Sequence, residues 1–217
     1  MNAENLFLSC DSERAERPAS GPCYGSLDLR LGDCMDVMAT FPDGHFDLAI
    51  VDPPYGISAE KMNMCDGYYG KGWKDRLSQG SGKLKNRILQ NGQSEWDTAP
   101  PPPEYFTELR RVSKHQIIWG GNYFPLPPSR CWLFWDKLMG GDFADGELAW
   151  TSFDKVVRKF TKCNKAPGQI HPTQKPVALY KWTLANFAKP GMRVLDTHMG
   201  SGSIAIAAHY AGIHLTA

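Results

Sequence analysis

The chain has 217 residues, 42% of them hydrophobic and 22% charged, and a formal net charge of +1, which is the mix of a soluble globular protein. A chain of this length buries a core without disulfides or metals, and its six cysteines form no C-x-x-C pair, so we expect reduced thiols and no metal site. The amino terminus has no basic start or apolar run, and no stretch approaches the roughly 18 apolar residues of a membrane span, so we expect a cytoplasmic protein.

The sequence of the amino-terminal quarter predicts a mobile leader followed by the first strands and helix of a domain. Residues 1–25 are polar and show neither helical nor strand periodicity. Alternating apolar residues over 27–31 predict a strand, and 34–40 is a short helix candidate. The apolar run over 46–51 is typical of a buried parallel strand, and it stops abruptly at Asp52-Pro53-Pro54-Tyr55.

The stretch over 56–95 has the composition of a loop. It is rich in Gly, Lys, Asn and Gln, with Tyr68, Tyr69 and Trp73 interleaved. A structureless loop of this length in a compact domain is usually functional or disordered. We therefore expect a mobile segment with a binding role.

The rest of the chain alternates helices and strands. Helices are expected over 104–112, 176–188 and 203–211, and strands over 115–119, 131–135, 147–153, 192–196 and 213–217, with 156–160 extending a hairpin. This alternation predicts an α/β fold around a mostly parallel sheet. The consecutive strands after Cys131 suggest a mixed edge.

Two basic segments stand out from an otherwise acidic chain. The segment 61–94 carries a local charge of +5, and 155–175 carries +6 with no acidic residue. This distribution indicates a localised contact with a polyanion. The alternative is two solvated lysine-rich loops, and charge alone does not separate the two interpretations.

The first chemical motif is Asp52-Pro53-Pro54-Tyr55. A strand that ends there places these residues at the carboxyl edge of the sheet, where open α/β folds bind ligands. The prolines remove two amide donors and leave carbonyl acceptors in a stiff turn. Acceptors beside an aromatic ring suit an amino-substituted base, whose amine would donate to Asp52 and to the Pro53 carbonyl while Tyr55 stacks on the ring. The alternative is a simple proline turn that ends a strand.

The second motif is a strand over 192–196 that ends in Asp196 and leads through Gly200-Ser201-Gly202 into a helix. The glycines let a ligand approach the backbone, and a helix amino terminus offers free N–H groups. An acid at the strand end opposes phosphate and suits a cation, such as the amino group of a methionine moiety. Taken alone the signal is weak, because many Rossmann-like turns look similar.

Together with His171-Pro172-Thr173-Gln174-Lys175-Pro176, these motifs resemble the DNA amino-methyltransferases. The catalytic motif comes first and the cofactor motif last, which resembles the permuted beta class, and the stretches 118–124 and 135–137 look like a phage or prophage subgroup. The resemblance runs from about residue 27 to the end. It implies a Rossmann-like S-adenosylmethionine-dependent methyltransferase fold over 26–217, with a mixed, mostly parallel sheet, helices on both faces and a circularly permuted motif order.

The resemblance also implies residue roles. Asp52, Pro53, Pro54 and Tyr55 would hold the target base, and S-adenosylmethionine would be held by Asp33, Thr173, Lys175, Asp196, Gly200, Ser201 and Gly202. Double-stranded DNA would meet the loop 56–95 and a small target-recognition segment over 154–170, through Lys71, Lys74, Lys83, Lys85, Arg87, Arg158 and Lys159. Three of these residues have plainer alternatives: Asp33 as a helix cap, Lys175 as a surface charge and His171 as a loop histidine.

Two departures from the family pattern bear on cofactor binding. Thr197-His198 stands where the family usually has Pro-Phe, which puts an apolar contact with the cofactor in doubt. The sequence also stops at Ala217, where the family continues to an acid that binds the ribose, so we expect weak S-adenosylmethionine binding.

The expected activity is transfer of a methyl group to the exocyclic amine of a flipped adenine in DNA. An N4-cytosine methyltransferase is the alternative, although that group more often has Ser in place of Asp52. A glutamine methyltransferase of proteins also uses a Pro-Pro-Tyr turn, but there the cofactor motif comes first. A catalytically impaired DNA-binding remnant is a further alternative, and the protein is expected to act as a monomer or homodimer. The recognition sequence and any companion nuclease are not determined.

Overall fold

The computed structural model describes residues 24–57, 97–138, 144–163 and 174–217. The leader over residues 1–23, most of the loop expected over 56–95, and residues 164–173 lie outside these described residues. The comparisons that follow therefore concern the four described ranges. No helix within them is long and apolar enough to cross a membrane.

The described strands form one eight-stranded sheet in the order β1-β8-β7-β2-β3-β5-β4-β6. The strands are β1 (Leu27–Asp28), β2 (Leu48–Val51), β3 (Gln116–Trp119), β4 (Trp132–Asp136), β5 (Gly146–Thr151), β6 (Arg158–Thr161), β7 (Arg193–Leu195) and β8 (His214–Thr216). From β1 to β3 every pair is parallel, whereas β5 is antiparallel to both of its neighbours, β3 and β4. The expected mostly parallel sheet with a mixed edge is confirmed.

One strand pairing differs from the expectation. The segment 156–160 does not extend a hairpin with β5, because β6 pairs in parallel with β4 at the edge of the sheet. Antiparallel β5 returns the chain, and the short connection over residues 152–157 then carries it past β4 to the free edge beside that strand. The sequence periodicity identified a strand there but carried no information on its partner.

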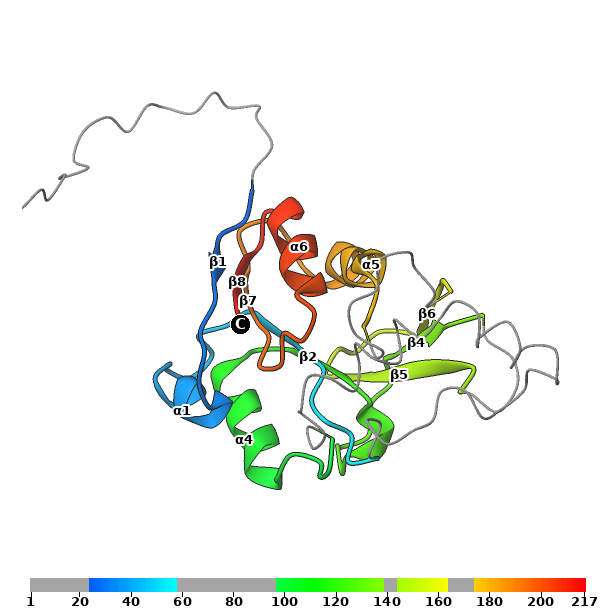
Figure 1. Cartoon of the computed structure of the whole chain (residues 1–217), viewed down its shortest axis with the longest axis horizontal. Coiled ribbons are helices and arrows are strands. Elements are labelled where there is room, and N and C mark those ends of the chain that lie inside the picture. The colour runs from blue at the N-terminus through cyan, green and yellow to red at the C-terminus, as the bar shows by residue number, and fades with distance from the viewer. Residues whose placement is uncertain (1–23, 58–96, 139–143, 164–173) are drawn as a thin grey trace, which may run out of the picture.

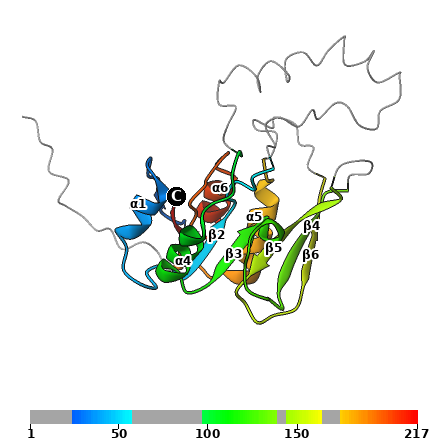
Figure 2. The same cartoon turned by 90° about the horizontal axis from the view of Figure 1, so that it is seen from below.

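Within the described ranges, four α-helices cover the sheet, two on each face (Figures 1 and 2). They are α1 (Cys34–Ala39), α4 (Pro103–Val112), α5 (Val177–Phe187) and α6 (Ser203–Tyr210), and a single 3₁₀ turn, η2 (Gly121–Tyr123), follows β3. Helix α1 packs on α4, and α5 packs on α6. Each of the four agrees with a helix expected from the sequence.

The central strands are buried on both faces, and alternate residues enter different cores. In β2, Leu48 and Ile50 join the core under α5 and α6, while Ala49 and Val51 join the core under α1 and α4. In β3, Ile117 and Ile118 divide in the same way. This alternation follows from the two-residue repeat of a strand, and it explains why the two strands have continuous apolar sequences.

Register brings the two sequence motifs to one edge of the sheet. Strands β2 and β7 are parallel neighbours, with Ala49 opposite Leu195. Asp52 follows β2 directly and Asp196 follows β7 directly. Both carboxylates therefore lie at the carboxyl edge of adjacent strands, where open α/β sheets bind ligands.

Candidate active site

The turn after β2 is fixed by an acid that the sequence did not single out. The backbone N–H groups of Tyr55 and Gly56 both donate to Asp97 Oδ1, at 2.6 and 2.8 Å, and Asp97 is buried. Gly56 has a φ of +72°, and a side chain there would overlap Pro100. Asp97 thus satisfies the amide donors that follow the two prolines and locks the turn that presents Asp52.

The Asp52 carboxylate is held on both oxygens. The Tyr55 hydroxyl donates to Oδ1 at 2.7 Å, and the Lys175 ammonium donates to Oδ2 at 2.6 Å. The same ammonium donates to the Tyr55 hydroxyl at 3.1 Å. Because a carboxylate has about four lone-pair positions, these two contacts orient Asp52 and leave it able to accept further hydrogen bonds.

Lys175 is a buried residue, so its interpretation as a surface charge is wrong. Its side chain is 3% exposed and pairs with Asp52 and also with Glu147, whose Oε2 lies 2.9 Å from Nζ. Burial disfavours the ammonium, but the two carboxylates outweigh that cost and hold the pKa of Lys175 above its ordinary value. Lysine is almost never buried without such partners.

Glu147 and Lys137 complete a row of four charges that sequence reasoning missed. Lys137 Nζ donates to Glu147 Oε1 in a short contact, and both side chains are largely buried. Burial favours the neutral form of Glu147, yet Lys175 and Lys137 hold its pKa below the ordinary value. The row Lys137–Glu147–Lys175–Asp52 alternates in sign and has no net charge.

The Tyr55 ring lies in a close aromatic site. It stacks on Tyr123 with centroids 5.0 Å apart and meets the edge of Phe124 at 6.2 Å. Gly120, with a φ of +68°, lies directly against the ring, since a Cβ there would come within 2.2 Å of it. Only glycine allows both the positive φ and the close approach of the ring. The segment from Gly120 to Phe124 therefore forms the wall against which the Tyr55 ring packs.

In the second motif, a buried carboxylate, that of Asp196, precedes the glycine turn over residues 200–202. Asp196 is 2% exposed and accepts the His198 backbone N–H at 3.0 Å. Burial raises its pKa to about 7. Gly200 and Gly202 both have positive φ, and Gly202 caps α6. The Ser201 and Ser203 hydroxyls are hydrogen-bonded to each other at 3.0 Å, and a cofactor contact with the glycines stays a prediction.

Thr197 and His198 form a polar contact with α4. The Tyr105 and Thr197 hydroxyls are 2.6 Å apart, and Thr197 Oγ1 lies 2.9 Å from His198 Nδ1. The His198 ring meets Tyr105 edge-on, with centroids 5.7 Å apart. Burial lowers the pKa of His198, so the imidazole is neutral near pH 7.

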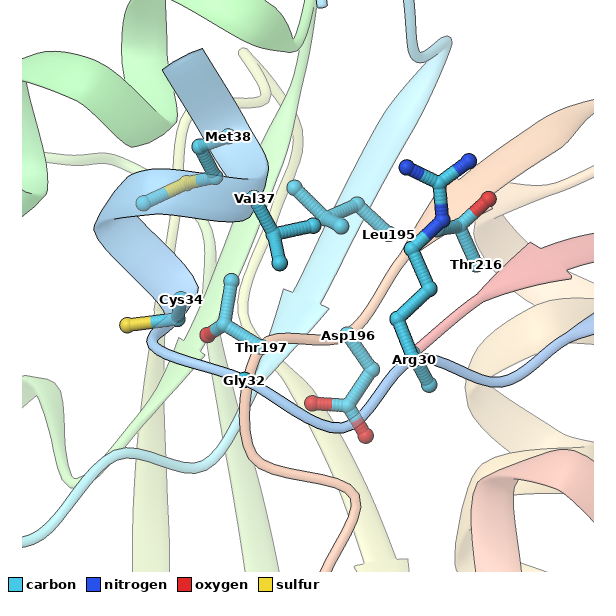
Figure 3. Close-up of a pocket in the computed structure, with 10 residues that line it drawn as sticks. Arg30, Gly32, Cys34, Val37, Met38, Leu195, Asp196, Thr197 and Thr216 are labelled. Carbon is cyan, nitrogen blue, oxygen red and sulfur yellow. The ribbon is translucent and has the colours of Figure 1, made fainter. Parts of the chain in front are cut away.

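A pocket opens beside Asp196 at the same edge of the sheet (Figure 3). Val37, Met38 and Leu195 supply apolar walls, and Asp196 and Thr197 supply polar groups. The full lining is Arg30, Gly32, Cys34, Val37, Met38, Leu195, Asp196, Thr197, Thr216 and Ala217. The pocket is therefore built from the β1–α1 connection and α1 on one side and from the ends of β7 and β8 on the other, two parts of the chain that are distant in sequence.

Asp33 acts as a helix cap in this structure. Its Oδ1 accepts the backbone N–H groups of Met35 and Asp36, at 2.7 and 3.4 Å, at the start of α1. Its neighbours Gly32 and Cys34 line the pocket. The capping alternative is thus confirmed, and the contact of Asp33 with a cofactor stays a prediction.

The remaining candidate residues divide by where they fall in the chain. Arg158 and Lys159 are exposed on the edge strand β6, and Lys159 pairs with Asp136 at 2.8 Å. Thr173, His171 and the five basic residues of the first segment lie outside the described residues; those five are Lys71, Lys74, Lys83, Lys85 and Arg87. Their roles stay predictions.

Comparisons with known proteins agree with this architecture. The family model N6_N4_Mtase, described as DNA methylase, matches residues 113–215. The chain is 23% identical to the type II methyltransferase M2.MboI of Moraxella bovis, over 84% of this chain and 78% of that protein. It is 26% identical to the putative methylase YubD of Escherichia coli strain K12, over 85% of this chain and 82% of that protein.

Two solved structures share the fold at low sequence identity. The M1.HpyAVI–SAM complex gives a TM-score of 0.51 at 15% identity, covering 88% of this chain and 91% of that one. The PvuII DNA methyltransferase, named as cytosine-N4-specific, gives 0.52 at 12% identity, covering 91% and 84%. The family match falls on the segment that carries β3 to β8, and both relatives with curated names are methylases. On these grounds the chain is similar to the DNA methylases, with the family match confined to residues 113–215.

Proposed function

We propose that the protein transfers a methyl group from S-adenosylmethionine to the exocyclic amine of an adenine flipped out of double-stranded DNA. The observation that carries this proposal is the placement of Asp52 and Asp196 at the carboxyl ends of the adjacent parallel strands β2 and β7. One carboxylate belongs to an acceptor-rich turn and the other borders a pocket. Two substrates bound at these places would meet.

The pocket beside Asp196 has the chemistry of a nucleoside–amino acid site. Val37, Met38 and Leu195 would pack against the adenosine. Asp196 is buried and forms no ion pair with the residues that the structure describes, so an ammonium group would relieve the cost of its burial. When bound, S-adenosylmethionine supplies a methyl group made electrophilic by its sulfonium.

The turn after β2 would activate the amine by orienting it. The lone pair of an aromatic amine is delocalised into the ring, which makes it a poor nucleophile. Hydrogen bonds from its two N–H groups to the Asp52 carboxylate and the Pro53 carbonyl favour a tetrahedral nitrogen with a free lone pair. Such contacts strengthen in the transition state, so they raise the rate rather than only the affinity.

Methylation of duplex DNA made by amplification, and therefore unmethylated, tests the proposal directly. The whole chain is incubated with this DNA and S-adenosylmethionine labelled in the methyl group, and the DNA is digested to nucleosides for mass spectrometry. We expect N6-methyladenine, since Asp52 stands where the cytosine-specific group more often has Ser. N4-methylcytosine would overturn the choice of base. Binding of DNA with no methyl transfer would indicate a DNA-binding remnant.

Tyr55→Phe and Tyr55→Ala separate the two parts of the side chain. The hydroxyl is hydrogen-bonded to Asp52 and Lys175, so it orients the carboxylate in addition to the stacking proposed for the ring. A hydrogen bond to a charged group contributes about 1.5–3 kcal/mol, and base stacking about 1–3 kcal/mol by truncation. We expect kcat to fall moderately in Tyr55→Phe and much further in Tyr55→Ala. Unchanged activity in Tyr55→Phe would mean that the hydroxyl contacts have no part in transfer.

Binding of S-adenosylmethionine is expected to strengthen as pH rises from about 6 to about 7.5, because Asp196 must ionise to pair with an ammonium. The pKa of this carboxyl is raised to about 7 from 3.8. Between pH 3.8 and about 7 the folded protein therefore holds a proton on Asp196 that the unfolded chain has released. The cofactor-free protein accordingly loses stability as pH rises through this range. Burial lowers the pKa of the neighbouring His198, which favours its neutral form as pH rises.

Calorimetric titration at several pH values measures this dependence. In Asp196→Asn, binding should be weaker and independent of pH across the same window. A wild-type dissociation constant that stays flat from about pH 6 to about pH 7.5 would contradict an ion pair with Asp196.

Arg158→Ala is expected to lower the slope of log K against log salt concentration by about one unit, as loss of one phosphate contact does. Arg158 is exposed on β6, which three strands (β3, β5 and β4) separate from β2 in the sheet. Arg110→Ala on α4 is the control, because Arg110 is also exposed but lies outside the basic segments. If log K depends on log salt concentration with the same slope in wild type and in Arg158→Ala, the segment 155–175 is solvated and does not contact DNA.

A further inference from the structure

The row of charges behind Asp52 comes from the antiparallel half of the sheet. Glu147 is near the start of β5, and Lys137 directly follows β4. Because β5 runs against β3, its beginning lies at the edge where β2 and β3 end. Strand β4 runs against β5, so its end reaches the same edge. Two residues to which the sequence analysis gave no role at the site are thereby brought beside Asp52 and Lys175.

The Lys175 ammonium has a single well-defined position. It contacts Asp52 Oδ2 at 2.6 Å, Glu147 Oε2 at 2.9 Å and the Tyr55 hydroxyl at 3.1 Å. It also lies over the rings of Trp119 and Tyr55, at 5.4 and 5.6 Å from their centroids. The lysine side chain is flexible in itself, but Lys175 is 3% exposed and is held on several sides by these contacts. It therefore acts as a fixed donor toward Asp52.

Glu147 is shared between two lysines through different oxygens. Its Oε1 accepts from Lys137, and its Oε2 faces Lys175. Without Glu147, the Lys175 ammonium would keep Asp52 as its one anionic partner among the described residues, and the two side chains could then shift together. With Glu147 in place, the ammonium is held between two carboxylates, and Lys137 fixes the second of them.

We propose that Glu147, supported by Lys137, is a positioning residue for methyl transfer, because it holds the Lys175 ammonium in the place that orients the Asp52 carboxylate toward the target amine. This inference rests on the proposed function. In this role Glu147 contacts neither substrate, since its two oxygens face Lys137 and Lys175. Its effect passes through Lys175 to Asp52, and a small misplacement of a positioned group can cost on the order of 10²-fold in rate.

The first test compares Glu147→Gln with Glu108→Gln in the whole chain. Glu108 is a matched control: its side chain is also 19% exposed and pairs with a cation, Arg111, but on α4. With amplified duplex DNA and labelled S-adenosylmethionine, we expect kcat of Glu147→Gln to fall by about 10²-fold. KM for both substrates should stay within about two-fold, since neither substrate contacts Glu147. Glu108→Gln should match wild type.

Two further variants separate position from charge. Glu147→Asp keeps the charge but shortens the side chain, so kcat should recover only in part. Lys137→Met leaves Glu147 opposite Lys175 without its second partner, so we expect a smaller fall than in Glu147→Gln. Full recovery of kcat in Glu147→Asp would mean that charge alone matters and would overturn the positioning role.

The pH profile gives a readout that a loss of stability does not produce. The titratable groups around Lys175 are Asp52, Tyr55, Lys137, Glu147, Tyr180 and Asp196. In wild type the pKa of Lys175 is raised, so its ammonium persists through the neutral range and is lost only at high pH. Glu147→Gln removes one of its two carboxylate partners while burial remains. We expect kcat of this variant to fall off at lower pH than in wild type.

A measurement without catalysis keeps this inference separate from the proposed function. The Lys175 ammonium can be followed by nitrogen NMR of lysine-labelled protein, with its signal assigned by loss in Lys175→Arg. Its titration should move to lower pH in Glu147→Gln and stay unchanged in Glu108→Gln. If wild type does not methylate DNA but this shift appears, the proposed function fails, while the interaction between Glu147 and Lys175 is supported. An unchanged titration, or a kcat in Glu147→Gln equal to wild type, overturns the positioning role.

Discussion

Replacing Asp52 with alanine is expected to lower kcat for methyl transfer by on the order of 10²- to 10³-fold, as removal of one preorganised transition-state contact does. The carboxylate is oriented on one oxygen by Tyr55 and on the other by Lys175. Its remaining acceptor capacity faces the edge of the sheet where the target amine would bind. Loss of Asp52 therefore removes an acceptor that the amine needs while it attacks.

The fold should survive this replacement. Asp52 follows β2 rather than forming part of it, its side chain is 25% exposed, and Lys175 keeps its pair with Glu147. Steady-state kinetics on amplified duplex DNA, with circular dichroism as the check on folding, measures the effect. Asp52→Asn keeps one acceptor oxygen and should retain more activity than Asp52→Ala. A folded Asp52→Ala protein that methylates at the wild-type rate would contradict the mechanism.

Lys175→Met is expected to give the largest loss of stability, about 3–5 kcal/mol in the free energy of unfolding. The substitution leaves the Asp52 and Glu147 carboxylates at a buried site without the ammonium that pairs with both. The effect should fall toward the lower end of that range, because Asp52 is partly exposed and Glu147 retains Lys137. Equilibrium unfolding in urea measures it.

The pH dependence of this loss follows from the two pKa shifts. The pKa of Lys175 is raised, so its stabilisation is present below its ordinary value of 10.5 and is lost as pH rises beyond it. The pKa of Glu147 is lowered, so its stabilisation is present above its ordinary value of 4.5 and is lost as pH falls below it. The difference between wild type and Lys175→Met should be greatest between these limits.

A double variant provides the control for the lysine. Lys175→Met combined with Glu147→Gln removes the unpaired carboxylate together with its partner, so part of the lost stability should return. Two effects that simply add would show that Glu147 and Lys175 do not interact in the folded protein, contrary to the ion pair seen here.

The sequence by itself determined the elements of the sheet and the place of both motifs. Local signals were sufficient: continuous apolar runs gave β2 and β3, and the flanking Pro and Gly residues marked the ends of α5 and β7. Asp52 and Asp196 each follow a strand that is buried on both faces. Because parallel strands end at one edge, the α/β pattern placed both motifs at the carboxyl edge of the sheet, whereas the adjacency of β2 and β7 came from the strand order.

Only the tertiary structure decided the surroundings of Asp52. Glu147 and Lys137 reach it because β5 and β4 run antiparallel, and Asp97 reaches Tyr55 across a long stretch of sequence. Strand order and direction depend on non-local pairing, which a strand's own periodicity does not encode. Whether a charged residue such as Lys175 is buried likewise depends on the partners that the fold supplies. The sequence therefore determined where the site lies, and packing determined which charges hold it.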